Sequence, residues 1–112
     1  MKVTPKEIAS WPSGNYLNIA TLSISTEHLE SVLGCKLLRG TEAGLGEYSA
    51  IGIETSNGVA VELIQYENSP SKLGFTVRVD SGSNYAGTLS QLLADLRFSE
   101  KDISWLSSSI NG

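Results

Sequence analysis

The chemistry most readily suggested by this 112-residue sequence is phosphate binding, at the glycine-rich stretch LRGTEAGLGEY (residues 38–48). A P-loop needs GxxxxGK[ST] followed by a helix, but here Gly46 precedes Glu47, Tyr48 and a strand-like pattern. The three glycines also fail the GxGxxG spacing, and the carboxylates of Glu42 and Glu47 would repel phosphate. We predict a flexible bend or bulged connection between strands, whose Glu42, Glu47 and Tyr48 could contact a partner.

Nucleophilic and metal chemistry would have to use His28 and Cys35, the single histidine and the single cysteine. This pair cannot assemble a zinc site of the usual type. His28 falls in the first turn of a predicted helix, and no GxSxG motif is present to supply a nucleophile. Cys35 follows the helix-ending Gly34, where the helix dipole disfavours a thiolate. We therefore predict no catalytic residue, no metal, no cofactor and no enzymatic activity.

Two carboxylates, Glu54 and Glu62, are predicted on the same face of a sheet, where a pair could serve acid–base catalysis. However, the strand register described below places Arg78 opposite Glu62. A neighbouring guanidinium keeps a carboxylate ionised. The pattern therefore predicts a cross-strand ion pair, worth about 0.2–1 kcal/mol.

Composition limits the classes of partner. The length fits one domain spanning residues 1–112, with a small polar tail at 107–112 that we expect to fray. The formal charge is −4 and the basic residues are scattered, which argues against nucleic acid and favours a basic partner. No apolar run suits a membrane helix, no signal peptide is visible, and one cysteine fits a reducing compartment. We expect a cytoplasmic protein.

Residues 16–25 predict the first strand. Leu17 and Ile19 alternate with polar residues, and then Leu22 and Ile24 continue in the opposite phase. Either a bulge shifts the phase, or the strand is partly buried on both faces.

Asn57–Gly58 marks a hairpin between two further strands. A two-residue loop would set Ile53 opposite Glu62 and mix the faces. A three-residue bulged loop at 56–58 sets Ile53 opposite Val61, and burial favours this register. The next strand then aligns Val77 with Leu63 and Arg78 with Glu62.

Helices are predicted before and after these strands. The first begins at a Thr26 cap and ends at Gly34. Two further caps are predicted: Thr88 with Gln91, before a stripe of four leucines, and Ser99 with Asp102. The order β-α-β-β-β-α indicates an α+β fold, an antiparallel sheet with two helices packed on one face. The opposite face, expected to be solvated or to bind a partner, carries Tyr48, Glu54, Glu62, Tyr66, Thr76 and Arg78.

Residues 58–66, GVAVELIQY, resemble the final strand of a glyoxalase-type (vicinal oxygen chelate) module. The resemblance implies a small-ligand or metal-binding module in which Glu62 is a metal ligand, with a dimer completing the site. The first strand lacks the histidine that this family usually places there, so the resemblance implies the fold rather than the activity.

Taken whole, the chain resembles immunity proteins of bacterial contact-dependent and related toxin systems, which are small, acidic, cytosolic and single-domain. The resemblance implies tight, non-enzymatic binding to a cognate toxin domain, for which a basic nuclease would fit. The residues expected to bind are Glu42, Glu47, Tyr48, Glu54 and Tyr66. Two other hypotheses remain open: the glyoxalase-like module, and a structural subunit of a larger assembly with an exposed hydrophobic sheet edge.

Overall fold

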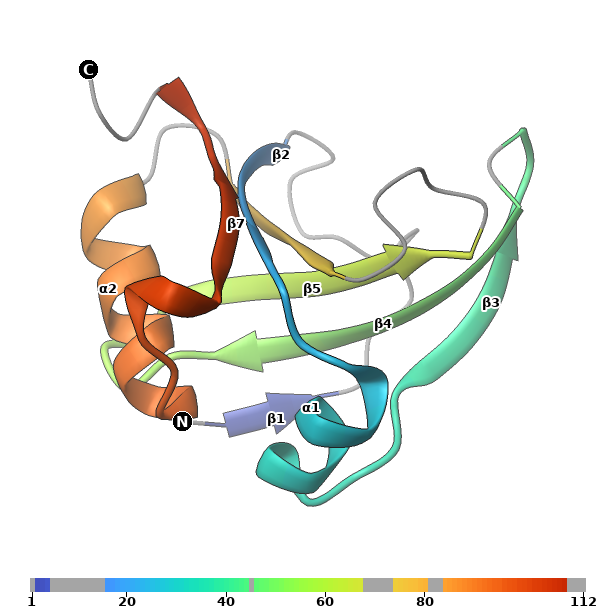
Figure 1. Cartoon of the computed structure of the whole chain (residues 1–112), viewed down its shortest axis with the longest axis horizontal. Helices are drawn as coiled ribbons and strands as arrows, with labels where there is room; N and C mark the ends of the chain where they lie inside the picture. Colours follow the sequence, from blue (N-terminus) through green and yellow to red (C-terminus); the bar gives the residue numbers. More distant parts are fainter. Residues whose placement is uncertain (1, 5–15, 45, 68–73, 81–83, 109–112) are drawn as a thin grey trace.

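The computed structural model describes residues 2–4, 16–44, 46–67, 74–80 and 84–108 (Figure 1). Seven strands form one antiparallel sheet in the order β1-β4-β5-β6-β2-β7, and β3 pairs with β4 beside β1. The strands are β1 (Lys2–Thr4), β2 (Tyr16–Leu22), β3 (Leu38–Glu42), β4 (Gly46–Glu54), β5 (Ala60–Tyr66), β6 (Phe75–Asp80) and β7 (Ile103–Leu106). The helices are α1 (Thr26–Leu33), α2 (Tyr85–Leu96) and the 3-10 turn η2 (Glu100–Asp102).

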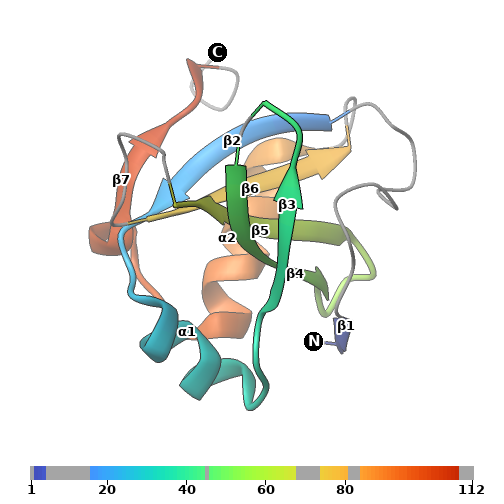
Figure 2. The same cartoon turned by 90° about the vertical axis from the view of Figure 1, so that its right-hand side faces the viewer.

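Both helices pack on one face of the sheet, as the sequence predicted (Figures 1 and 2). Leu29 from α1 and four leucines from α2 join the inward side chains of the central strands in one buried core. The strand residues alternate with a period of two and the helix residues recur every three or four positions. The α+β class is therefore confirmed, and the strand count exceeds the prediction.

The phase change in β2 is caused by a bulge. Asn18 pairs with Arg78, whereas Ala20 pairs with Val77, so Ile19 is the extra residue. Ile19 and Ala20 are both fully buried. Of the two predicted alternatives the bulge is confirmed. It allows Asn18 to lie beside Arg78 on the face of the sheet opposite the helices, which we call the second face.

The predicted hairpin register is confirmed throughout. Ile53 lies opposite Val61 and Ile51 opposite Leu63. The loop is residues 56–58: the Thr55 N–H donates to the Val59 carbonyl at 2.9 Å, and Gly58 has a φ of 82°. On the other side of β5, Leu63 pairs with Val77 and Glu62 with Arg78.

Helix starts were the least accurate predictions. Ser25, one residue before the predicted Thr26, caps α1 by accepting from the His28 N–H, while Gly34 ends the helix as predicted. Asn84, not Thr88, caps α2, and Thr88 is buried in its first turn. Asn is at least as good a helix cap as Thr, and the Asn84 side chain accepts a hydrogen bond from the Gly87 N–H. The capping box of Ser99 with Asp102 is confirmed.

The predicted order omits β1, β3 and β7, because short edge strands carry little periodicity of their own. Residues 103–106 are predicted only as a short strand or turn, and they form β7. Ser107, in the tail expected to fray, is buried and donates its N–H to the Ile19 carbonyl at 2.9 Å. The rest of that tail from 109 on lies outside the described residues.

The hairpin loop is tied to α2 by Asp95. Its carboxylate accepts the Ser56 N–H at 2.8 Å, the Ser56 hydroxyl, and the Gln91 amide at 3.0 Å. The Ser56 hydrogen bonds hold the pKa of Asp95 below its ordinary 3.8.

We predict that Asp95→Asn lowers the free energy of unfolding by about 0.5–1.5 kcal/mol at neutral pH, the range for such a hydrogen bond. Because the folded pKa is depressed, the stabilisation is present above the ordinary value of 3.8 and is lost as pH falls through the folded pKa. Urea unfolding across pH measures this, with Glu54→Gln on the same hairpin as the charge-matched control. Equal loss from both variants would contradict the prediction.

Candidate functional site

The glycine-rich stretch at residues 38–48 forms the hairpin between β3 and β4. It therefore connects two strands, as the sequence predicted. Gly44 and Gly46 have positive φ angles of 83° and 87° in the turn. Gly40 lies opposite Tyr48, and a Cβ built on it would lie 2.5 Å from the Tyr48 hydroxyl. The Tyr48 ring therefore packs over the backbone of β3, an arrangement that covers a glycine in an edge strand.

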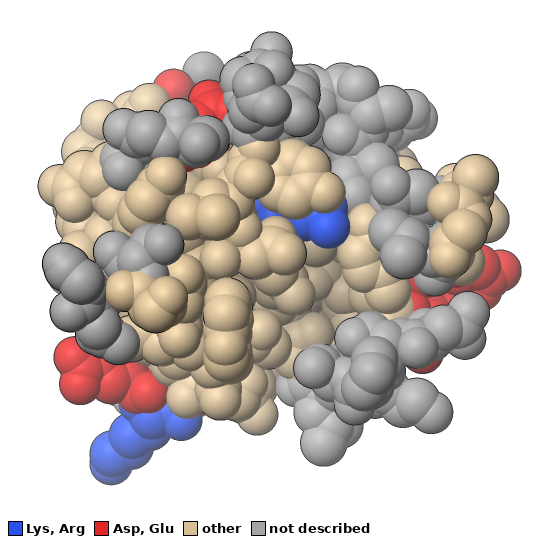
Figure 3. Space-filling model, turned by 90° about the horizontal axis from the view of Figure 1, so that it is seen from above, with Lys and Arg blue, Asp and Glu red and all other residues tan. Residues whose placement is uncertain are grey.

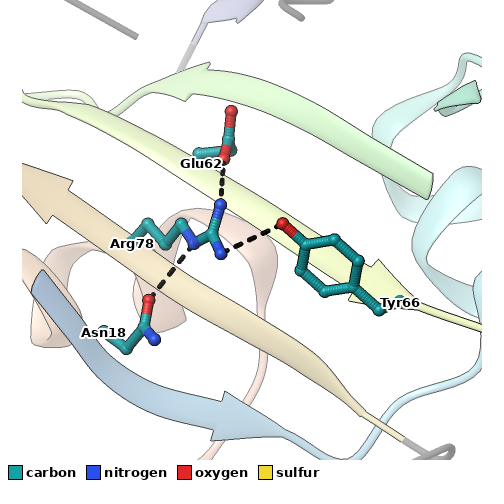
Figure 4. Close-up of polar contacts among 4 residues, drawn as sticks. All are labelled: Asn18, Glu62, Tyr66 and Arg78. Atoms are coloured by element: carbon teal, nitrogen blue, oxygen red, sulfur yellow. Dashed lines mark hydrogen bonds and ion pairs between the residues drawn. The ribbon is translucent and has the colours of Figure 1, made fainter. Parts of the chain in front are cut away.

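Arg78 stands at the centre of a polar network on the second face of the sheet (Figure 4). Its Nε donates to the Asn18 side-chain oxygen at 3.2 Å, one terminal nitrogen to Glu62 at 3.4 Å, and the other to the Tyr66 hydroxyl at 3.3 Å. Strands β2, β5 and β6 therefore each contribute to holding the guanidinium. This fixes both the position and the plane of the cation.

The ion pair is buried, which differs from the solvated face that the sequence predicted. Glu62 is 0% exposed and Arg78 is 5% exposed. The Arg78 guanidinium also lies 4.4 Å from the ring centre of Tyr16 and 5.6 Å from that of Tyr66. Alternation correctly assigned these side chains to the face opposite the helices, but alternation alone does not determine how deeply that face is buried.

Next to this network, Tyr66 lies beside Tyr48, with ring centres 6.0 Å apart in an edge-to-face arrangement. Tyr48 is only 7% exposed, so it supports Tyr66, which is half-buried. The Glu67 N–H donates to the Glu47 carbonyl, which brings the two exposed glutamates side by side. We call Glu47, Tyr48, Tyr66 and Glu67 the acid–aromatic patch.

The two glutamates of the patch interact directly. A side-chain hydrogen bond with Glu47, and then the charge of Glu47, raise the pKa of Glu67 above its ordinary 4.5. Arg39 on β3 lies 3.9 Å from Glu67, and both side chains are more than half exposed. An exposed pair of this kind contributes little stability, so the carboxyl pair remains accessible to an incoming cation.

The structure brings together part of the predicted binding set. Glu47, Tyr48 and Tyr66 belong to the patch, and the backbone of Glu42 pairs with Gly46 at the same hairpin, although its side chain lies outside the described residues. Glu54 is exposed at the opposite end of β4. Sequence reasoning missed Tyr16, Asn18 and Glu67. The first two required the β2 register across the bulge, and the third required the pairing of β4 with β5 beyond Tyr66.

The other residues with potential chemistry are not brought together. Glu62 faces the Arg78 guanidinium, so the carboxylate that the glyoxalase resemblance assigns to a metal is held by an internal cation. His28 stacks edge-to-face on Phe98, and Cys35 is half-buried after α1. Within the described part of the chain, no group of three or more His, Cys, Asp and Glu residues is placed to hold a metal ion.

Comparison of the chain with protein-family models, with curated proteins and with solved structures gives no match. Over the residues that the structure describes, no helix has both the length and the apolar character needed to cross a membrane.

We predict that Arg78→Met lowers the free energy of unfolding by about 3–5 kcal/mol, because it leaves the Glu62 charge buried without its guanidinium. The double variant Arg78→Met with Glu62→Leu should recover much of this loss, because the second change removes that charge. Denaturant unfolding of both single variants and the double variant gives the coupling energy. Additive losses would show that the two side chains do not stabilise each other.

We also predict that Glu67→Gln raises the melting temperature at neutral pH. Because the folded pKa is raised, the protonated pair stabilises the fold fully below 4.5, and this contribution is lost as pH rises through the folded value. Glutamine keeps a hydrogen-bond donor toward Glu47 without the charge. The gain should disappear below pH 4.5, and thermal unfolding across pH measures it. A gain that is the same at every pH would contradict the prediction.

Proposed function

We propose that this chain is a non-enzymatic protein-binding domain that neutralises a basic partner, and that the partner is the toxin domain of a bacterial toxin–immunity pair. The observation that carries this proposal is the acid–aromatic patch. It presents a half-buried tyrosine, supported by a buried one, beside two exposed carboxyl groups held together.

The patch has the composition of a binding hot spot. Aromatic rings held rigidly contribute contact area at low entropic cost, and Tyr66 is fixed both by Tyr48 and by the hydroxyl contact with Arg78. A lysine or arginine of the partner placed between Glu47 and Glu67 would relieve their mutual repulsion. Binding would then remove a charge repulsion that is already present in the free protein.

Charge on the wider surface also suits a basic partner. Seen from above, acidic atoms lie at several margins of the molecule, including the side where β3 and β4 lie, and basic atoms lie near the centre and at one margin (Figure 3). The net charge of −4 would speed the approach of a cationic partner.

The toxin assignment rests on the whole-chain resemblance to immunity proteins, and the patch supplies the surface through which such a protein would act. The first experiment is a pull-down with the tagged protein, using both the source lysate and the product of the adjacent upstream gene. We expect one stoichiometric partner with a basic C-terminal domain, whose toxicity in cells this chain suppresses. A partner that is acidic, or toxicity that persists, would contradict the proposal.

With that partner in hand, we predict that Glu47→Gln combined with Glu67→Gln slows association severalfold at low salt, and that the difference disappears at high salt. Glu54→Gln makes the same kind of charge change at the far end of β4 and should leave the rate nearly unchanged. Stopped-flow or surface-based association rates measure this. If Glu54→Gln slows association as much as the combined patch variant does, binding does not use the patch.

A further inference from the structure

The sheet ends at β7, and the two edges of the sheet differ in character. At one edge, β3 carries the exposed Arg39. At the other, β7 has the sequence ISWL, with no charge and no proline. Charges and prolines are the devices that normally prevent an edge strand from pairing with another chain. No described residue pairs with the outer side of β7.

The hydrogen-bonding groups of this edge are available at a defined position. The Ser107 N–H points inward, because it donates to the Ile19 carbonyl at 2.9 Å, and Leu106 lies opposite Ala20. Neighbouring residues of a strand direct their N–H and C=O groups to opposite sides. The N–H and C=O of Leu106 therefore point away from β2, toward the position of a further strand.

A groove of about 410 Å³ lies between α2 and this edge. Among the described residues that line it, five are apolar and one is acidic: Ala86, Leu89, Ser90, Leu93, Glu100, Ile103 and Leu106. The space is where inward side chains of an added strand would lie. On the other face of β7, Trp105 is 47% exposed and would be covered by that strand's outward side chains.

We propose that β7 and this groove bind an extended segment of a partner protein, which adds to the sheet as an eighth strand. The segment carries apolar side chains at alternate positions for the groove and a lysine or arginine at the end near Glu100, the one charged residue among the described groove lining. Main-chain pairing supplies affinity, and the alternate side chains supply specificity. The site stands on a different surface from the acid–aromatic patch and does not rest on the proposed function.

The test uses an acetylated and C-terminally amidated eight-residue peptide of alternating valine and threonine that ends with lysine, the end that antiparallel pairing with β7 places near Glu100. Two matched peptides replace the lysine with glutamate or N-methylate the alternate amides that pair with β7. We expect the lysine peptide to slow hydrogen exchange of the Leu106 amide and to shift the NMR signals of β7 and α2. The N-methylated peptide should not bind, and the glutamate peptide should bind roughly tenfold more weakly.

Protein variants separate the groove from the rest of α2. Ala86→Phe fills the groove from an exposed helix position and should weaken binding by roughly tenfold or more, whereas Ala94→Phe, exposed on the same helix outside the groove, should not. Unchanged melting temperatures confirm that both variants fold. The proposal is overturned if the lysine peptide leaves Leu106 exchange unchanged or if Ala86→Phe binds as well as Ala94→Phe. It is equally overturned if Leu106 protection rises with protein concentration alone, since the occupant would then be a second copy of the chain.

Discussion

The arrangement of this protein depends on the register of β5 between its two neighbours. With Leu63 opposite both Ile51 and Val77, the inward side chains at the centre of these three strands are apolar and form one core with the helices. The same register necessarily places Glu62 beside Arg78 on the other face. A slip of one residue would bury charge in the main core and expose the apolar set, so one constraint determines both faces.

The buried ion pair turns this register into a rigid scaffold for the surface. Two opposite charges removed from water need good geometry and further hydrogen bonds to avoid a net cost. Here Asn18 and Tyr66 supply those bonds, and the bulge at Ile19 brings Asn18 into range. Tyr66 is thereby fixed next to Glu67 and above Tyr48. The internal electrostatics of the second face and the exposed acid–aromatic patch are therefore parts of one structure.

The two proposed surfaces use different physics. The patch offers charge and rigid aromatic area at the β3–β4 hairpin, which favours fast, salt-sensitive association with a cationic surface. The β7 edge offers main-chain hydrogen bonds and an apolar groove, which favour an extended segment whatever the net charge of the protein that carries it. Because the surfaces are built from separate elements, variants at one leave the other intact, and each proposal can fail alone.

Sequence patterns were enough to predict the α+β class, the hairpin loop at 56–58, the register across β4, β5 and β6, and hence the pairing of Glu62 with Arg78. These follow from local turn chemistry and from alternation, which are encoded within a few residues. Sequence patterns misplaced the start of α2, because Asn84 and Thr88 are both competent caps and tertiary packing selected one of them. The burial of Glu62, the contact of Glu47 with Glu67, the separation of Glu54 from them and the groove between α2 and β7 appear only in the folded structure. Those features depend on which strands become neighbours and how layers overlap, and contacts between residues far apart in the chain leave no periodic signal in the sequence.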